Sequence, residues 1–501
     1  MAVIATDILL PDFRSAAAAR HRRWRGIKDR ITGWIMAVGG ISVILAVVLI
    51  AFYLVYVVLP LFRSAHIAES TEFVLPGGTD SATLHYALEE QREIGLRVTA
   101  AGAVIFFSTK NGAIMEQKSL LGRMPASITA FSAGDPASNL LVAGMSNGSA
   151  ILARHAYAIS YPNDVRLIEP RLDFPLGQEP IAVDSASQPL HVISAQSNDQ
   201  QTTLAAATGE GRVWLVSLTR KRKSLASKEV DRVRTRAKLS MEYPATHLAV
   251  DVDQQELYAA DTQGYLYYYD ISNKSEPRLV ERAAAVADGV SITALAFLSG
   301  GISILVGDSS GRVAQWFPVR DDKNNYSLKQ VRSFDSQTSP ITVLAPEYFR
   351  KGFVAADAGG KLGIYHTTAE RMVALQQIAG GAVSRMAIAP RANGMLVERP
   401  GGRLSVLEVE NKHPEVSWRS LWGKVWYESR QQPEYIWQSS SASSDFEPKF
   451  SLTPLAFGTF KAALYASLFA VPLAIMGAIY TAYFMHARDR KSTRLNSSHR
   501  L

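Results

Sequence analysis

Two long stretches without a charged side chain constrain this chain most, because neither can lie exposed to water over its whole length. Residues 31–62 are 32 consecutive residues without Asp, Glu, Lys or Arg, and residues 462–485 are 24 more. About 20 apolar residues suffice to cross a bilayer. We therefore predict one transmembrane helix over residues 31–62 and a second over residues 457–486. The first is expected to be an uncleaved anchor, because a secretory signal peptide has a much shorter apolar core.

Basic flanks predict how the two helices are oriented. Six Lys or Arg residues lie between positions 20 and 30, and Arg488, Arg490 and Lys491 follow the second stretch. An excess of Lys and Arg marks the cytoplasmic side of a membrane. Residues 1–30 and 487–501 are accordingly predicted to be cytoplasmic tails, and the region between the helices to be translocated. In a bacterium this describes a multi-pass inner-membrane protein with a large periplasmic domain.

Regularly spaced turn glycines indicate a repeated unit between the two helices. Each glycine separates two short apolar strands, and six intervals over 290 residues average about 48 residues, which is within the range of propeller repeats. Three upstream strands, Ile128–Phe131, Ile292–Leu295 and Ile341–Leu344, begin 19 or 20 residues before their glycine. The seven turn glycines are Gly112, Gly148, Gly211, Gly264, Gly311, Gly360 and Gly402.

These repeats predict two transmembrane α-helices flanking an all-β domain, a seven-bladed β-propeller over residues 63–430. Each blade is expected to be a four-stranded antiparallel sheet. The Gly-His and Trp-Asp signature of WD repeats is mostly lost, so the propeller is expected to be WD-like but degenerate. Six or eight blades stay open as alternatives, because two of the intervals are 36 and 63 residues long. A linker over residues 431–456 follows.

The residues that enzymes of several classes require are absent. The chain has no cysteine, which excludes disulfides, thiolate metal sites and a cysteine nucleophile. It also lacks the phosphate-binding Gly-Lys-Ser/Thr loop, the His-Glu-x-x-His metal pair and the Gly-x-Ser-x-Gly nucleophile elbow. We therefore expect no catalytic residue, no metal site and no cofactor in this chain.

Two repeat segments admit a redox interpretation as well as a structural one. Residues 308–316 and 357–362 resemble the docking repeats of quinoprotein dehydrogenase propellers. The same turns occur in propellers without redox chemistry, because Asp caps the turn and Gly accepts a positive φ. We favour the structural interpretation.

A basic run over residues 220–238 carries nine Lys or Arg against two acidic residues. Its position in a translocated domain argues against nucleic acid as a partner. We expect a solvated loop between blades, and the alternative is a segment that concentrates anions near a transport mouth.

Two polar residues near the start of the second helix are candidates for contact with an anion. Thr459 and Lys461 precede the apolar core of this helix. Lys461 could meet an incoming anion, whereas the alternative is a lysine that extends to the membrane interface and carries no function.

The residues around this helix resemble a known family of transporters. The stretches Tyr435–Ser441, Phe446–Lys461 and Ala470–Ala474 resemble the start of the permease core in the phosphate-specific ABC importers, in particular the PstC branch. Some members of that branch carry one N-terminal span and a large periplasmic insertion. The resemblance implies a permease subunit for ATP-driven import of inorganic phosphate.

The same resemblance implies partners and an incomplete chain. The implied partners are a second permease subunit, a cytoplasmic ATPase dimer that holds the ATP, and a periplasmic phosphate-binding protein, with membrane lipid around the helices. The segment from Lys491 resembles translated sequencing-adapter DNA, so we expect a truncated permease fragment with a non-native tail from about residue 491. The alternative function is a two-span, membrane-anchored periplasmic propeller that acts as a binding or scaffolding module.

Overall fold

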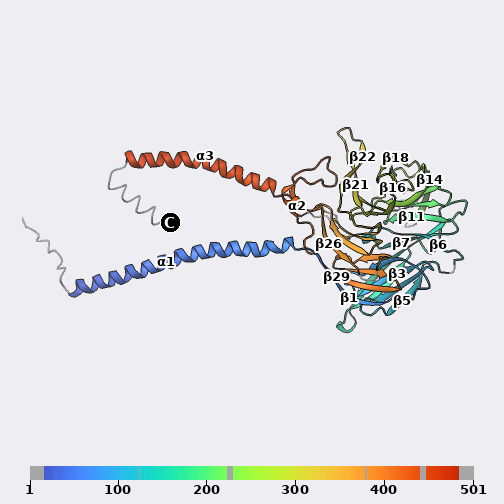
Figure 1. Ribbon diagram of the computed structural model, residues 1–501, viewed down its shortest axis with the longest axis horizontal. Coiled ribbons are helices and arrows are strands. Elements are labelled where there is room, and N and C mark those ends of the chain that lie inside the picture. The colour runs from blue at the N-terminus through green and yellow to red at the C-terminus, as the bar shows by residue number, and fades with distance from the viewer. Residues whose placement is uncertain (1–15, 123, 223–229, 379–380, 441–446, 485–501) are drawn as a thin grey trace, which may run out of the picture. The chain divides into compact units, whose positions relative to one another are not determined.

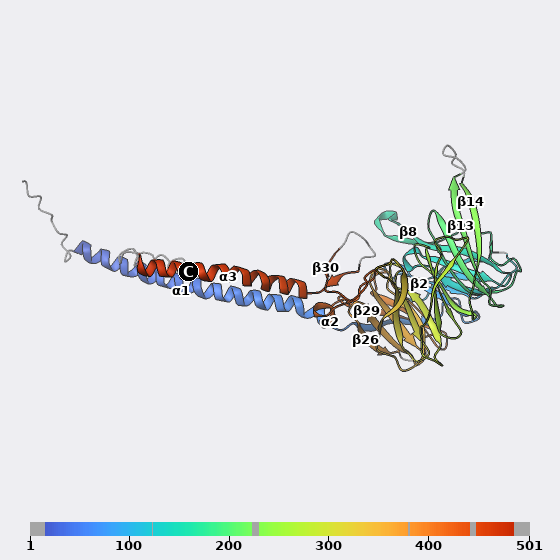
Figure 2. The ribbon, with the colours of Figure 1, turned by 90° about the horizontal axis from the view of Figure 1, so that it is seen from above.

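A computed structural model describes residues 16–484, apart from 123, 223–229, 379–380 and 441–446. The predicted tail from residue 487 therefore lies outside the described residues. Helix α1 spans Ala16–Val58 and continues as the 3-10 turn η1 over Leu59–Phe62, and helix α3 spans Thr453–Tyr483. The strands between them gather in one β domain (Figure 1), and the long hairpin of β13 (Val213–Arg222) and β14 (Val230–Leu239) reaches beyond its neighbours (Figure 2).

Seven antiparallel sheets form the β domain, which confirms the seven-bladed propeller. Six of these blades are each built from one continuous stretch of the chain, and the first strand of each stretch is the innermost. Their strands are β2 (Thr83–Leu88), β3 (Ile94–Thr99), β4 (Ala103–Ser108) and β5 (Ile114–Ser119); β6 (Ile128–Ala133), β7 (Leu140–Met145) and β8 (Ser149–Ser160) with β9 (Leu167–Asp173) and β10 (Ile181–Ala182); β11 (Leu190–Ser197), β12 (Gln201–Thr208), β13 (Val213–Arg222) and β14 (Val230–Leu239); β15 (Ala245–Val250), β16 (Glu256–Asp261), β17 (Tyr265–Asp270) and β18 (Arg278–Ala284); β19 (Ile292–Phe297), β20 (Ile304–Asp308), β21 (Val313–Arg320) and β22 (Tyr326–Ser333); and β23 (Ile341–Pro346), β24 (Gly352–Asp357), β25 (Lys361–His366) and β26 (Arg371–Gln377).

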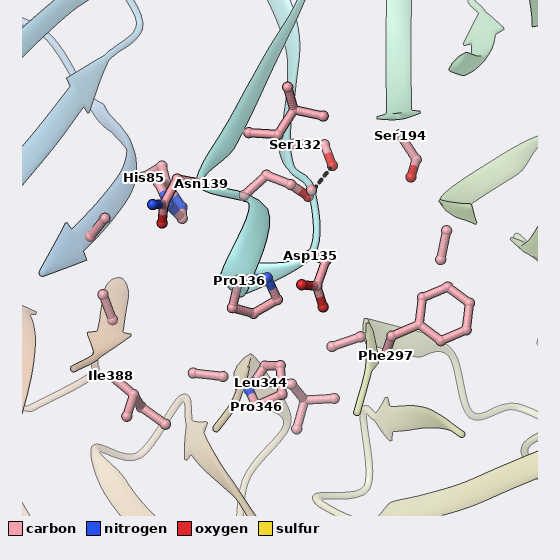
Figure 3. Close-up of a pocket in the computed structure, with 18 of the residues that line it drawn as sticks. His85, Ser132, Asp135, Pro136, Asn139, Ser194, Phe297, Leu344, Pro346 and Ile388 are labelled. Atoms are coloured by element: carbon pink, nitrogen blue, oxygen red, sulfur yellow. Dashed lines mark hydrogen bonds between the residues drawn. The ribbon is translucent and has the colours of Figure 1, made fainter. Parts of the chain in front are cut away.

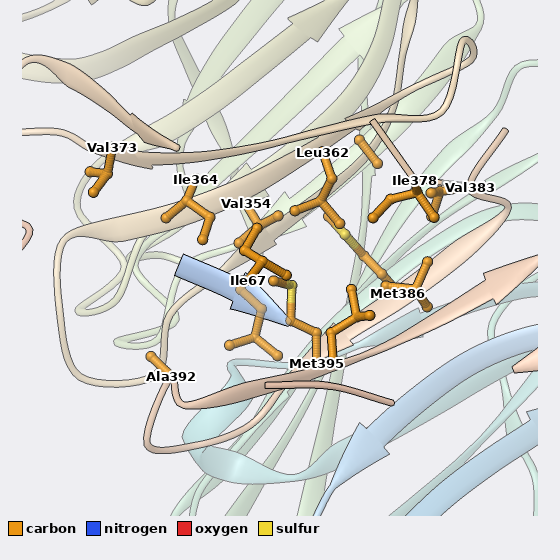
Figure 4. Close-up of a cluster of buried hydrophobic side chains, with 14 residues drawn as sticks. Ile67, Val354, Leu362, Ile364, Val373, Ile378, Val383, Met386, Ala392 and Met395 are labelled. Carbon is orange, nitrogen blue, oxygen red and sulfur yellow. The ribbon is translucent and has the colours of Figure 1, made fainter. Parts of the chain in front are cut away.

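The seventh blade is assembled from both ends of the domain. It consists of β27 (Arg385–Ile388), β28 (Gly394–Arg399), β29 (Arg403–Glu410) and, as its outer strand, β1 (His66–Val74). Ile67 of β1 is buried among Val354, Ile364 and Met395, in a cluster that joins this blade to the preceding one (Figure 4). Burying such a side chain contributes about 1.5–3 kcal/mol. The first strand of the domain therefore closes the ring.

A β-bulge that contains a threonine explains the repeated Ile-Thr pattern of the innermost strands. The register shifts between the first and third residue of the strand in six of the seven blades. At the shifted position, Thr246, Thr293 and Thr342 each donate a side-chain hydrogen bond to a carbonyl of the second strand, at 3.1–3.3 Å. A β-bulge leaves the extra residue outside the ladder, and the threonine hydroxyl supplies an additional bond there.

The uneven glycine intervals have two separate causes. Six of the seven predicted glycines lie between the second and third strands of a blade, but Gly112 lies between the third and fourth strands of its blade. The glycine equivalent to the others is Gly102, so the assignment of Gly112 to this position is wrong and the 36-residue interval disappears. The 63-residue interval is real, because the blade that contains Gly148 has five strands, one more than the others, and a long third strand β8 of 12 residues.

A segment after the last blade docks onto the propeller before α3 begins. It contains the short helix α2 (Trp418–Trp422) and the strand pair β30 (Trp437–Gln438) and β31 (Lys449–Phe450). The ammonium group of Lys351 lies 2.6 Å from the Glu428 carboxylate, and the two side chains are only 3% and 6% exposed. The equally buried Arg332 donates to the carbonyl of Trp426. Removing one partner of a buried ion pair typically costs about 3–5 kcal/mol, so these contacts fix the segment firmly.

The two apolar helices present their side chains outward. Side chains such as Ile44 in α1 and Phe469 in α3 are 66% and 75% exposed. Contiguous apolar surface of this extent requires a cover other than water. By length and composition, residues 23–62 and 453–483 are each long and apolar enough to cross a membrane.

The turn glycines provide a test of the blade architecture. Gly311 has φ +88°, and a Cβ there would lie 2.4 Å from the Gln337 carbonyl oxygen. Gly211 occupies the same turn in another blade with φ +76° and open space around it. We expect Gly311→Ala to lower the thermal unfolding midpoint clearly more than Gly211→Ala, which incurs only the backbone strain of about 1 kcal/mol. Circular dichroism of the full chain in detergent measures the unfolding midpoints of both variants. Equal midpoints for the two variants would contradict the turn geometry.

Candidate functional site

The innermost strands of all seven blades enclose a cavity of about 310 Å³, here called the central pocket. Figure 3 shows labelled side chains from several blades around it, among them His85, Ser194, Phe297 and Ile388. Most of the wall is aliphatic. Its apolar residues include Leu84, Ala249, Val250, Leu295, Leu344 and Met386.

Hydrogen bonds between neighbouring blades hold the polar part of this wall in place. Ser194 accepts a bond from the backbone amide of Val250 at 3.1 Å, and the Gln196 amide donates to the Val250 carbonyl at 3.3 Å. The Gln196 oxygen in turn accepts from the amide of Asp135 at 3.2 Å. These bonds fix the shape of the wall, and they leave the Ser194 hydroxyl hydrogen and the second Gln196 amide hydrogen for other partners.

Two histidines contribute uncharged polar groups to the pocket. Burial, and secondarily the charge of Arg385, lowers the pKa of His85 to about 4, and the His85 ring lies 5.9 Å from that of Phe131. Burial lowers the pKa of His155 to about 3, and its Nδ1 atom is buried without a hydrogen-bond partner among the described residues. Both imidazoles are neutral near pH 7. They offer hydrogen bonds without attracting ions.

Charged and phenolic groups lie toward the ends of the pocket. Asp135 follows β6, and one of its carboxylate oxygens accepts from the Ala137 amide at 3.0 Å in the turn η2 (Pro136–Ser138). Tyr348 follows β23, where burial and the nearby Asp135 charge raise its pKa to about 12. Arg385 begins β27. The pocket therefore has charged and phenolic groups at its rim, whereas the polar groups within its strands are uncharged.

Strand register shows on which face of the ring the chain enters and leaves. Pro346 ends β23 beside the start of β24, whose first residue Gly352 pairs with His366 at the end of β25. The first and third strands of a blade therefore end at the same edge. In the seventh blade the third strand ends at Glu410, which pairs with His66, the first residue of β1.

The chain thus enters at His66 and leaves after Glu410 at the edge where the innermost strands end. We call the ring face at this edge the exit face. Asp135, Pro346 and Tyr348 line the central pocket at or just beyond the ends of their innermost strands, which places that end of the pocket on the exit face.

The residues predicted to face an anion lie in α3, away from this pocket. The Thr459 hydroxyl donates to the Leu455 carbonyl of its own helix at 2.9 Å. The Lys461 ammonium lies 5.7 Å from the centre of the Tyr465 ring. Residues two apart on a helix do not face each other, so the structure does not bring the two side chains together. Their contact with an anion stays a prediction.

The central pocket was not predicted from the sequence, although the Ile-Thr pattern marks several of the strands that line it. Its lining residues belong to the same innermost strands that the Ile-Thr pattern identified, such as Ile292–Phe297. The pattern gave the position of those strands but not which side chains point inward. Among the described residues, no group of three or more His, Asp or Glu side chains is placed to hold a metal ion.

Comparisons with known proteins find similarity to solved propeller structures, but not to a known family. No family model matches the chain, and no curated protein matches it. A solved β-propeller domain of Cps50 (Swd1) from Myceliophteria thermophila is 14% identical, covers 69% of this chain and all of its own, and superposes with a TM-score of 0.46. At this TM-score we base the propeller assignment on the strand pairing instead.

The predicted membership in the phosphate-specific permeases is wrong. No family model and no curated protein of that kind matches the chain, and the described residues form a propeller between two apolar helices rather than a helical permease. The resemblance combined two unrelated features. Residues such as Trp437 and Glu447 belong to the segment docked on the propeller, and Ala470–Ala474 lie in one apolar helix whose composition is common to membrane spans. The second permease subunit, the ATPase dimer and the phosphate-binding protein are withdrawn as partners with it.

The neutral state of His85 predicts a pH dependence of stability. Below the ordinary histidine pKa of 6.5 the unfolded chain binds a proton that folded His85 does not, so His85 lowers stability progressively as the pH falls toward 4. His85→Phe removes this contribution. We expect the thermal midpoint of the variant, relative to the unsubstituted chain, to be higher at pH 5 than at pH 7.5. An unchanged difference between the two pH values would show that His85 is protonated in the folded protein.

Proposed function

We propose that this chain is a membrane-anchored propeller that acts as a binding or scaffolding module on the periplasmic side of a bacterial inner membrane. One observation carries the proposal. Both chain connections toward the apolar helices leave the ring at the exit face, where one end of the central pocket lies. A binding site on that face is kept close to the membrane by the short covalent link to the first apolar helix. His66 follows the first apolar stretch by only four positions.

Anchoring is supported by the outward-facing apolar side chains of α1 and α3 and by the basic residues that flank them. Lipid is the cover that such helices require. Lys and Arg before the first helix and after the second favour the cytoplasm for both flanks. This topology places the propeller in the periplasm.

The docked segment connects the propeller to the start of α3. Glu428, which pairs with the buried Lys351 of the propeller, belongs to the segment that ends at Leu452, whose amide donates to the Leu421 carbonyl at 2.7 Å. Helix α3 begins at the next residue. A propeller fixed in this way holds a bound partner at a defined position relative to the helix, which is what a scaffold requires.

The wall of the central pocket favours an uncharged and mostly apolar group as its occupant. Neutral His85 and His155 supply hydrogen bonds, and the aliphatic wall excludes ions because a desolvated charge is costly without a partner. A pocket of about 310 Å³ accommodates a small apolar molecule or a large side chain of a protein partner. The proposal assigns binding rather than catalysis to this pocket and requires no cofactor.

The absence of native cysteine permits a direct test of topology. Lys329→Cys places a single thiol on the exposed outer strand β22, and Arg25→Cys places one in the basic flank before the first apolar stretch. In intact spheroplasts a membrane-impermeant maleimide should label Cys at 329 and leave Cys at 25 unlabelled until the cells are lysed. Labelling in the reverse order would place the propeller in the cytoplasm.

A photoreactive phenylalanine analogue at Phe297 tests the pocket in native membranes. We expect a discrete cross-linked product that the same analogue at Leu375, on an exposed outer strand, does not give. Ala296→Trp, which fills the pocket, should abolish the product. Ala284→Trp on the exposed end of β18 should leave it unchanged. Products of equal yield from both analogue positions would argue against binding in the pocket.

A further inference from the structure

Alternate arginines of β14 clamp two blades together. Arg232 donates to the Leu176 carbonyl at 2.9 Å, and Arg234 donates to the carbonyl of Ala182 in β10. Arg236 donates to the Ser185 hydroxyl at 3.0 Å, and its guanidinium lies 3.8 Å from the centre of the Trp214 ring in its own blade. Residues two apart share one face of a strand. Part of the basic run therefore has a structural role, and the tip of its hairpin, residues 223–229, lies outside the described residues.

A second cavity lies where this clamp ends, between the blade of β8 and the blade of β11–β14. It measures about 40 Å³, and its lining residues include Arg154, Arg220 and Arg232 and the turn 197–202 that contains Asp199. One water molecule requires about 10–15 Å³. The cavity therefore has room for a group larger than one water and of the size of a small oxyanion. We call it the arginine cavity.

The positive charge of the arginine cavity is not neutralised by the described residues. None of its three arginines lies within ion-pair distance of a described carboxylate, and Asp199 makes no ion pair with any described residue. Arg232 donates only to backbone carbonyls, and Arg154 donates to the Ser197 carbonyl at 3.3 Å. Three guanidinium groups against one carboxylate leave a charge of 3 − 1 = +2.

Arg154 supplies an independent indication of a missing ligand. Its Nε atom is buried and has no hydrogen-bond partner among the described residues. A buried donor without a partner costs about 1–3 kcal/mol, and more when it is charged. An anion in the cavity would remove that cost.

We propose that the arginine cavity binds a tetrahedral oxyanion with two negative charges, a group of the phosphate or sulfate type. Guanidinium groups present planar pairs of N–H donors that match the oxygens of such anions, and two negative charges balance the cavity. Leu218 and Arg220 lie near the end of the third strand β13, so the cavity belongs to the exit face. The oxyanion comes either from solution or from a lipid headgroup. This site is separate from the central pocket, and the inference does not depend on the proposed function.

Calorimetric titration of sulfate into the full chain tests the site, with the protein in phosphatidylcholine nanodiscs at constant ionic strength. We expect saturable binding that Arg220→Gln weakens at least about tenfold, because a charge-assisted hydrogen bond is lost. Arg320→Gln is the matched control. Arg320 is exposed, follows Gly311 by nine residues as Arg220 follows Gly211, and lines neither the central pocket nor the arginine cavity. The Arg320→Gln variant should bind sulfate with the same affinity as the unsubstituted chain.

Nanodiscs that contain phosphatidic acid distinguish the two sources of the oxyanion. A lipid headgroup in the cavity lowers the apparent affinity for sulfate in these discs, whereas unchanged affinity identifies a soluble anion as the ligand. Absence of sulfate binding at millimolar concentration overturns the proposal. Equal weakening by both Gln variants, or equally tight binding of acetate, overturns it as well.

Discussion

Pairing of β1 with β29 is the interaction on which the rest of this structure depends. It closes the ring, because the seventh blade has only three strands without β1. It also fixes the geometry of attachment, since His66 and Glu410 are directly opposite each other in the ladder. A chain that enters and leaves at paired residues has both of its flanking segments at one edge of one blade. The shared edge at which the chain enters and leaves the ring is thus a consequence of ring closure.

Buried charge adds a second constraint at the same face. The docked segment contributes Glu447 as well as Glu428, the partner of Lys351. Burial and the neighbouring Glu428 carboxylate raise the pKa of Glu447 to about 7. Glu447 accepts a hydrogen bond from the Glu428 amide at 3.1 Å. Buried ion pairs contribute little net stability but are costly to break. We infer that this cluster fixes the segment in one position on the propeller. A fixed segment agrees with a scaffold that must hold its partner at a constant position relative to a membrane helix.

Periodic sequence patterns predicted the architecture, whereas contacts between distant residues could not be predicted from local patterns. The apolar runs, the turn glycines and the Ile-Thr strands predicted two helices around seven blades, because these signals are local and repeat. The pairing of Lys351 with Glu428 joins residues 77 positions apart, and no local pattern reports such a contact. The central pocket was equally hidden, since its wall takes a few side chains from each blade. The family resemblance failed because it rested on apolar helix residues that many membrane spans share.

The most direct test of ring closure uses two engineered cysteines in a chain that has none. Ala68 and Glu408 are exposed partners in the β1–β29 ladder, and directly opposed strand residues have Cα atoms about 4.5–5.5 Å apart, within the range of a disulfide. The account predicts that the double variant Ala68→Cys, Glu408→Cys forms an intramolecular disulfide on mild oxidation, seen as a shifted band on a non-reducing gel. The mismatched pair Ala68→Cys, Arg403→Cys should not form one. A failure of the matched pair to cross-link, or equal cross-linking of both pairs, would contradict closure of the ring by β1.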